Sequence, residues 1–322
     1  MRIDREMAEP DRIERVSHSG LVPPPPDWAI EYTQLESAPN QGECHDLLLP
    51  GVLLRNSSFQ TTLSMSGCGE HERHIFVFLS NMQGVGRLNG KPLPEGLTAV
   101  CGTHPFEAVL PPTDMLGMTI HRDILSEYFG SVEGLAAPIW MRDGIHTLGD
   151  RKATFRATKM MKILFARHFD DPSALMESEA KKSLVSSIMD IIESILVGAD
   201  SRAEIDYEWS RRHQVVRRAR EYIIDRINEP LQISAICRDI GVSRRALQYS
   251  FEDALGINPI AFVRLFRLNR ARYDLTRTDA HLQVKDVIDR WGFWHPSRFS
   301  GEYRKMFDEL PSETLRRCRS IV

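Results

Sequence analysis

The sequence predicts an α+β protein in which a β-rich N-terminal part precedes an all-α C-terminal part. Short apolar runs separated by turn residues occupy about residues 28–120, and helical spacing of apolar residues replaces them after about residue 150. Residues 206–322 hold 22 basic and 16 acidic residues, a net charge of +6, whereas residues 1–205 hold 19 basic and 28 acidic residues, a net charge of -9. Together with the length of 322 residues, these changes indicate more than one domain.

The first 27 residues are expected to form a flexible leader that ends in four consecutive prolines, residues 23–26. The charged start, MRIDREMAEPDRIER, lacks the apolar segment of a secretion signal. No run of about 18 apolar residues occurs, so no membrane span is expected. The five cysteines are scattered and form no CxxC motif, which is typical of a reduced cytoplasmic protein.

Residues 28–150 read as a small β domain. Strand-like runs cover residues 74–79, 97–101 and 116–120, and Asn89-Gly90 marks a tight turn. Many short strands at this spacing are typical of a barrel or a sandwich. A small barrel can hold one ligand in its interior.

Residues 151–205 read as helices that follow the β domain. Helical composition covers residues 151–169, and a clearer helix covers residues 176–197, with Gly198 as its stop. Its apolar stripe includes Leu184, Ile188, Ile191 and Ile195. The stripe could pack against the β domain or form a dimer interface, and the sequence favours neither.

A group of histidines near one strand raises the question of a metal site. His71, Glu72 and His74 lie close together, and His104 and His121 are further candidates. A histidine at a strand edge is more often a hydrogen-bonded structural residue, and no GxSxG, HExxH or P-loop motif is present. We therefore assign no catalytic residue, no metal and no cofactor. A metal-dependent enzyme with an accessory helical domain is the alternative.

The C-terminal part contains a helix-turn-helix unit. An amphipathic helix covers residues 213–227. A short apolar face around Ile236 then leads to a turn at Gly241, and Ser243 is a good N-cap for a helix that runs to about Leu255. A long helix follows from about Pro259 to Thr276.

A second unit repeats the first. Ile236, Ile240, Gly241 and Val242 align with Val287, Trp291, Gly292 and Phe293, and, after a one-residue insertion, Leu247, Phe251, Leu255 and Pro259 align with Phe299, Tyr303, Phe307 and Pro311. A recognition helix fits the major groove of DNA, and successive grooves on one face lie roughly 34 Å apart. A linking helix of about 18 residues spans roughly 27 Å, which suits two units that read adjacent grooves. Of the 22 basic residues in this part, 20 are Arg, the side chain best suited to phosphates and guanine edges.

The stretch from about residue 213 to 317 resembles the AraC/XylS family of bacterial transcription regulators. The matching residues are Gly241-Val242-Ser243, Leu247, Phe251, Gly256, Pro259, Arg267-Leu268, Ala271, Gly292-Phe293, Phe299, Phe307, Pro311 and Arg316. The resemblance implies a DNA-binding domain with two helix-turn-helix motifs. It also implies an N-terminal cupin-like β-barrel with linker helices, used for effector binding and dimerisation. Asp308 departs from the family pattern, which has Gly there, and Gly301 stands where a polar side chain is common.

The resemblance also identifies candidate contacts with DNA. Arg245, Gln248 and Tyr249 are the expected base-reading residues of the first unit, with Arg244 on a phosphate. On the second unit the candidates are Ser297, Arg298 and Ser300, with His295 and Arg304 near phosphates.

We therefore expect a cytoplasmic transcription regulator, an activator and homodimer that binds promoter DNA, RNA polymerase and a small effector. The expected domains are a leader (1–27), an effector-binding barrel (28–150), linker and dimerisation helices (151–205) and the DNA-binding domain (206–322). If residues 74–79 form a strand, His74, Phe76 and Phe78 share one face and are candidates for the effector pocket. A regulator controlled by a protein partner is a further alternative.

Overall fold

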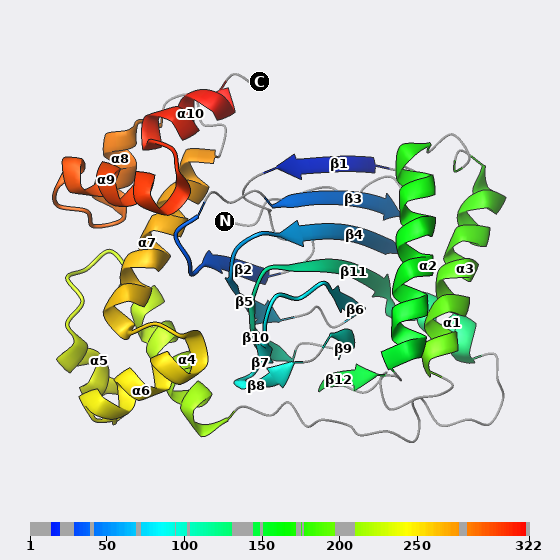
Figure 1. Cartoon of the computed structure of the whole chain (residues 1–322), viewed down its shortest axis with the longest axis horizontal. Coiled ribbons are helices and arrows are strands. Elements are labelled where there is room, and N and C mark those ends of the chain that lie inside the picture. Colours follow the sequence, from blue (N-terminus) through cyan, green and yellow to red (C-terminus); the bar gives the residue numbers. More distant parts are fainter. Residues whose placement is uncertain are drawn as a thin grey trace.

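The computed structural model of the chain contains a two-sheet N-terminal part, three helices beside it and a helical C-terminal part (Figure 1). The residues that it describes are 14–19, 29–38, 42–68, 72–93, 95–101, 104–130, 144–148, 151–171, 175, 177–196, 210–276 and 282–319. The expected order of strands followed by helices is confirmed, and the fold is a mixed α+β fold.

The N-terminal strands form two antiparallel sheets. The larger sheet has seven strands, in the spatial order β1 (Glu14–Ser19), β3 (Glu43–Leu49), β4 (Val52–Phe59), β11 (Thr113–His121), β6 (Arg73–Ser80), β9 (Gly96–Cys101) and β12 (Gly144–Leu148). The smaller sheet has five strands, in the order β2 (Ala29–Gln34), β5 (Leu63–Cys68), β10 (Pro105–Leu110), β7 (Gly86–Leu88) and β8 (Lys91–Leu93). Across the described strands no pairing joins the two sheets, so the expected closed barrel is corrected to two open sheets.

Two local features of the β domain bear on the sequence predictions. Asn89 and Gly90 connect β7 to β8 with φ values of 50° and 79°, which confirms the tight turn, since a two-residue hairpin turn of type I′ has positive φ at both positions. Residues 14–19, expected inside a flexible leader, instead form β1 and pair with β3 at the edge of the larger sheet. The four prolines lie outside the described residues.

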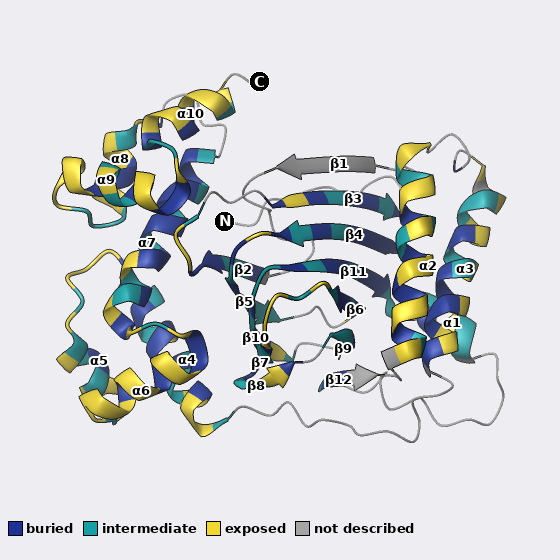
Figure 2. Cartoon of the chain, in the orientation of Figure 1, coloured by how far each residue is buried: buried dark blue, intermediate teal, exposed yellow. Residues whose placement is uncertain are grey.

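Three helices pack against the larger sheet, and Figure 1 shows them at one end of its strands: α1 (Arg122–Gly130), α2 (Arg151–Asp170) and α3 (Ser178–Leu196). A buried cluster joins them to the sheet, with Phe76 and Phe78 of β6 on one side and Met161 and Phe165 of α2 on the other. The two strand residues point the same way because successive strand side chains alternate between faces. Figure 2 shows the resulting contrast between buried and exposed sides of α2.

The apolar stripe of α3 belongs to this same cluster. Leu184, Ile188, Ile191 and Ile195 are all buried in the chain's own core, and the most exposed of them, Ile191, is only 6% exposed. Packing against the chain itself is therefore the role that the structure gives these four residues. Their burial leaves no apolar stripe there for a second subunit, which corrects the dimer-interface interpretation. Exposed apolar side chains lie instead on α2, at Phe155, Met160 and Ile163.

The C-terminal part consists of α4 (Arg211–Asp225), α5 (Ile233–Ile240), α6 (Arg244–Leu255), α7 (Pro259–Thr276), α8 (Val284–Arg290), α9 (Pro296–Phe307) and α10 (Pro311–Arg319). The predicted long helix from Pro259 to Thr276 is confirmed as α7. Two separate apolar cores lie along α7, one with α4 to α6 and one with α8 to α10. Because α7 contributes to both cores, it fixes the spacing between them.

The smaller sheet lies against the helical part, and charged side chains fill the contact. Glu107 of β10 is 2% exposed, and its Oε2 lies 2.7 Å from Nε2 of His213 on α4. Its Oε1 accepts a hydrogen bond from Arg220 of α4. Arg220 also donates to Oγ of Ser66 on β5 at 2.7 Å. Burial alone would raise the pKa of Glu107, but Arg220 and His213 outweigh it and lower this pKa to about 2.

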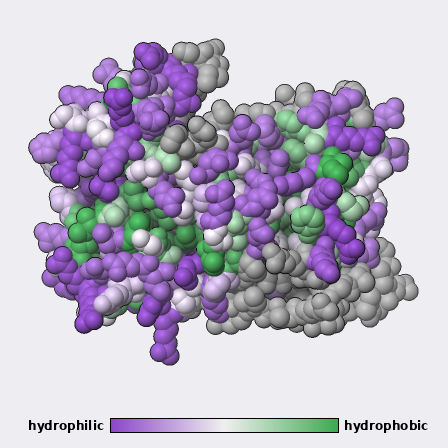
Figure 3. All heavy atoms as spheres, viewed as in Figure 1, coloured by the Kyte–Doolittle hydropathy of each residue, from purple (hydrophilic) through white to green (hydrophobic). Residues whose placement is uncertain are grey.

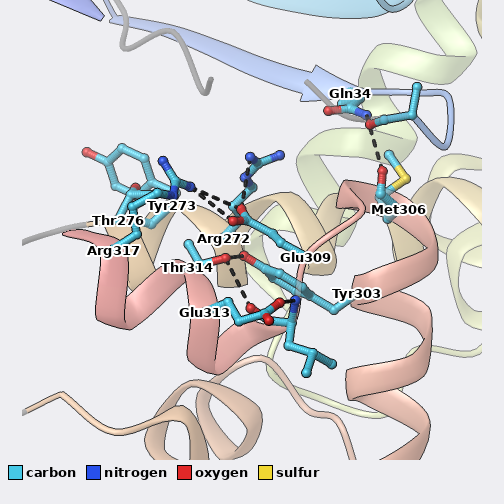
Figure 4. A network of polar contacts seen from close by, with 12 residues as sticks. Gln34, Arg272, Tyr273, Thr276, Tyr303, Met306, Glu309, Glu313, Thr314 and Arg317 are labelled. Atoms are coloured by element: carbon cyan, nitrogen blue, oxygen red, sulfur yellow. Dashed lines mark hydrogen bonds and ion pairs between the residues drawn. The ribbon is translucent and has the colours of Figure 1, made fainter. Parts of the chain in front are cut away.

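A second group of contacts extends the interface along α7. Glu31 of β2 pairs with Arg270 of α7. The backbone N–H of Gln34 donates to Oδ1 of Asn269 at 2.9 Å, and the Asn269 amide donates to the Gln34 carbonyl at 3.1 Å. The Gln34 side chain reaches the carbonyl of Met306 on α9 (Figure 4). The β domain therefore contacts both helix-turn-helix units.

The glycine at the end of α6 and its counterpart at the end of α9 provide a reciprocal stability test. Gly256 and Asp308 both have left-handed backbones, with φ values of 70° and 58°, and no atom lies within 4 Å of a Cβ placed on Gly256. Because an L side chain is disfavoured in this region, Asp308→Gly should stabilise the chain and Gly256→Asp should destabilise it, each by about 1 kcal/mol. Urea unfolding midpoints measure both effects, and equal midpoints for the two variants would contradict the argument.

Removal of the Glu107 carboxylate should destabilise the chain by about 3 kcal/mol because it leaves Arg220 buried without its main partner. The control is Glu221→Ala, which breaks the exposed ion pair between Glu221 and Arg217 on α4 and should change stability by less than about 1 kcal/mol. The pKa of Glu107 in the folded chain lies below its ordinary value of 4.5. The ionised carboxylate therefore contributes fully to the free energy of unfolding above pH 4.5, and this contribution is lost as pH falls toward about 2. The wild type should therefore lose more stability than Glu107→Ala over that range, and parallel acid curves would refute this.

Candidate nucleic-acid interface

The first helix-turn-helix unit forms as the sequence predicts. Gly241 ends α5 with a φ of 69°, and Ser243 caps α6, its Oγ accepting a hydrogen bond from the N–H of Ala246 at 3.1 Å. Leu247 and Phe251 are fully buried, which fixes the inner face of α6. The four candidate DNA contacts on this helix, Arg244, Arg245, Gln248 and Tyr249, are all exposed.

The second unit repeats this design with a proline start. Gly292 follows α8 with a φ of 67°, and Pro296 occupies the first turn of α9, where its missing N–H is not needed. Phe299 and Tyr303 form the buried face. His295, Ser297, Arg298 and Arg304 are exposed, whereas Ser300 is half-buried. The Ser300 hydroxyl donates to the carbonyl of Pro296 at 2.9 Å, so it is turned back onto its own helix.

The exposed side chains of both recognition helices pair with neighbours one turn away. Arg245 lies over the ring of Tyr249 and donates to its hydroxyl at 3.3 Å. Gln248 donates to Glu252 at 3.0 Å, and Arg298 donates to Glu302 at 2.9 Å. These are solvent-exposed contacts of low energy, so they leave the side chains free to exchange partners. Phosphates and the acceptor atoms of base edges can take their place.

A polar network holds the second unit against α7 (Figure 4). Arg272 of α7 donates to Glu309 at 3.1 Å, and Arg317 of α10 contacts the same carboxylate at 3.2 Å. The hydroxyls of Tyr303 and Thr314 lie 2.9 Å apart inside this unit. The network fixes α9 relative to the linking helix, which positions its exposed face.

The cavity of the β domain lies between the two sheets and has a volume of about 70 Å³. Its lining is mostly apolar and includes Ile75, Val77 and Leu79 of β6. The effector candidates of that strand lie on its other face: Phe76 and Phe78 are in the cluster with α2 and α3. His74 is 1% exposed and does not line the cavity. A ligand between the sheets would therefore meet the odd-numbered residues of β6 and not His74, Phe76 or Phe78.

Sequence reasoning did not single out the charged cluster at the domain contact. Glu107 follows Phe106 and precedes Ala108 in an otherwise apolar strand, and Arg220 lies on the buried side of α4. A charged residue at a core position is the signal that could have identified both. The partner of each lies more than 100 positions away, so the sequence could not have paired them.

The described part of the chain offers no support for a metal site or a membrane span. No group of three or more His, Cys, Asp or Glu side chains in it could hold a metal ion. Of the histidines considered, His121 contacts Glu72 and Asp123, and His71 lies outside the described residues. None of the described helices is long and apolar enough to cross a membrane.

Comparison with known proteins identifies relatives of the helical part. A family model described as "Helix-turn-helix domain" matches residues 236–317. The "Probable thc operon regulatory protein" of Rhodococcus erythropolis is 36% identical over 159 residues, which cover 47% of this chain and 46% of that protein. The "XylDLEGF operon transcriptional activator" of Pseudomonas putida is 27% identical over 128 residues, 39% of each chain. The match thus spans less than half the length of these relatives.

Solved structures that match the chain include the AraC-like transcriptional activator CuxR, with a TM-score of 0.41, 15% identity, and coverage of 80% of this chain and 95% of that chain. A probable AraC family transcriptional regulator from Rhodopseudomonas palustris has a TM-score of 0.31 and 33% identity over 33% of this chain and 98% of that chain. The assignment rests on the helix-turn-helix match and on the sequence relatives, in agreement with the repeated units described above. The helix-turn-helix match and these relatives support the assignment of the helical part, residues 236–317, to the AraC/XylS family of transcription regulators.

Proposed function

We propose that this chain is a sequence-specific DNA-binding transcription regulator that activates promoters in response to a small effector. The observation that carries the proposal is the pair of helix-turn-helix units in one chain, each with an exposed recognition helix. The names of two relatives, an operon regulatory protein and an operon transcriptional activator, support the same function. The domain boundaries expected from the sequence are part of this proposal.

In this function α6 and α9 enter successive major grooves. Arg245 and Gln248 read base edges, since Arg suits guanine and Gln suits adenine, and Tyr249 supports Arg245 by packing beneath it. Arg244 contacts a phosphate. On α9, Ser297 and Arg298 are the base readers, and His295 and Arg304 contact phosphates. Ser300 contributes less, because its hydroxyl is turned to the Pro296 carbonyl and it is half-buried.

The effector proposal rests on the cavity between the two sheets. Apolar side chains dominate its lining, and the Arg55 side chain there is already paired with Asp46, at 2.5 Å. A small, uncharged and mainly apolar molecule is the ligand that such a lining favours. Because the cavity has a volume of only about 70 Å³, a larger ligand has to move the two sheets apart in order to bind.

The smaller sheet provides a direct route from this cavity to the DNA-binding units. Along β10, Phe106, Ala108 and Leu110 line the cavity, whereas Glu107 points the other way into the contact with α4. Likewise Met65 of β5 lines the cavity and Ser66 contacts Arg220. A ligand that displaces these strands would therefore change the docking of the helical part. The ligand's differential affinity for the two arrangements sets how far their populations shift.

Homodimerisation and contact with RNA polymerase complete the proposal and follow from the family resemblance. The four α3 residues considered earlier are buried, so any dimer contact has to use other surfaces. Among the described residues of the helices beside the larger sheet, the large exposed apolar side chains are Phe155, Met160 and Ile163 of α2.

A binding-site selection tests the DNA-reading role. Arg245→Ala and Gln248→Ala should each weaken binding to the preferred sequence by about 1–3 kcal/mol and relax the preference at one position, because each removes a base contact. Arg167→Ala, an exposed arginine of α2, is the control and should leave the selected sequence unchanged. The assignment is refuted if both α6 variants select the wild-type sequence with wild-type affinity.

Thermal unfolding in the presence of small apolar metabolites tests the effector site. A ligand present at 100 times its Kd should add about 2.7 kcal/mol of stability, since it binds the folded chain alone. Ala108→Leu, which fills part of the cavity, should abolish that gain. A uniform lack of response across the metabolites would instead favour the alternative in which a protein partner controls this regulator.

A further inference from the structure

A groove lies between the two helix-turn-helix units, and its lining includes Arg298, a proposed base reader of α9, but none of the proposed base readers of α6. Its volume is about 400 Å³, and its walls come from the start of α5, the first turns of α7 and the turn from α8 into α9. Ile260 and Val263 of α7 form part of the floor, and Arg264, His295 and Arg298 contribute charge or polarity. We call this surface, represented by Ile260, Arg264 and Trp294, the central groove. Figure 3 shows apolar side chains gathered over this part of α7.

Two side chains of the central groove are more exposed than packing alone explains. Trp294 is 79% exposed and Ile260 is 60% exposed. Large apolar side chains that are exposed together in a groove with polar residues at its rim are typical of a surface that binds a partner. Trp294 directly precedes His295 and Pro296, where α9 begins, so its backbone is fixed by the recognition helix itself.

The charges of the central groove identify the kind of partner. Arg264 is exposed and has no ion pair with the rest of the described chain. Arg267, by contrast, donates to the carbonyls of Ile227 and Glu229 and serves to hold the turn between α4 and α5. Glu302 is the acidic residue in the lining, and Arg298 already pairs with it. The central groove therefore carries a net positive charge around apolar side chains. This combination complements a sugar-phosphate backbone, in which anionic phosphates alternate with less polar sugars.

The position of the groove relates it to DNA. In a helix-turn-helix unit the helix before the recognition helix crosses the sugar-phosphate backbone, and the first residues of the recognition helix meet the bases. The central groove lies between the start of α5, the backbone-crossing helix of the first unit, and the start of α9, the recognition helix of the second. When the two units occupy successive major grooves, the segment of duplex facing this surface is the backbone between them.

We propose that the central groove binds the DNA backbone between the two major grooves, with Arg264 on a phosphate and Trp294 against the adjoining deoxyribose. This inference rests on the proposed function and adds a contact that carries affinity without sequence information. Arg264 contributes one phosphate contact, and neutralising this phosphate releases a counterion from the DNA. Trp294 contributes apolar area that is exposed in the free protein and covered in the complex.

The test is a salt titration of DNA binding by the full chain, with the sequence that the wild type selects and with a scrambled duplex. Arg264→Ala should weaken binding to both duplexes by the same factor and reduce the slope of log affinity against log salt by about 1. Trp294→Ala should weaken binding to both by more than about fivefold without changing that slope. Neither variant should change the sequence recovered in a binding-site selection, in contrast to Arg245→Ala.

Matched controls separate this inference from general effects of the substitutions. Arg167→Ala removes an exposed arginine of α2, and Val85→Ala removes a 71% exposed apolar side chain of the β domain, so neither should alter binding. Wild-type unfolding midpoints for both groove variants establish that they fold, as expected for exposed positions.

Wild-type affinity and slope in both groove variants, with Arg245→Ala still impaired, would overturn the inference and leave the proposed function standing. A changed selected sequence for Trp294→Ala would also overturn it, because the residue would then read bases. Absence of sequence-specific binding by the wild type itself would instead refute the proposed function.

Discussion

The ion cluster of Glu107, Arg220 and His213 is the constraint on which the arrangement of the two parts depends. A carboxylate that is 2% exposed is tolerated only because a guanidinium and an imidazole from α4 reach it. Those two groups come from the helical part and the carboxylate comes from the sheet, so neither part satisfies the charges alone. The contact therefore ties the orientation of the helix-turn-helix units to a strand of the β domain, a relation that apolar packing by itself would leave less specific.

The smaller sheet has a different partner on each face, and this follows from strand alternation. Phe106 and Ala108 face the cavity, and Glu107 between them faces the helices. One strand thickness therefore separates the proposed effector site from the helix-turn-helix units. Coupling across this contact needs no extended pathway through the protein, because the strand that lines the cavity also carries the charge that pairs with α4.

The helical part was predictable in detail because its signals are local. Glycine turns at Gly241 and Gly292, the Ser243 cap and the repeated spacing of buried residues each act within a few positions, and the structure confirms them. The β domain was predicted less well because strand partners are distant in sequence. The expected barrel is two open sheets, and residues 14–19 join a sheet through pairing with β3, which no local pattern signalled.

The sequence by itself determined the order of strands and helices, the two helix-turn-helix units and the exposed faces of α6 and α9, since periodicity and turn chemistry set these locally. Tertiary structure alone decided which face of β6 meets the cavity, because alternation gives two faces and only the packing of α2 and α3 chooses between them. It likewise decided that Leu184 and Ile188 are core residues, since an apolar stripe looks the same whether the chain or a second subunit covers it. The joining of Glu107 to Arg220 also belongs to tertiary structure, because electrostatic pairing acts through space between residues 113 positions apart.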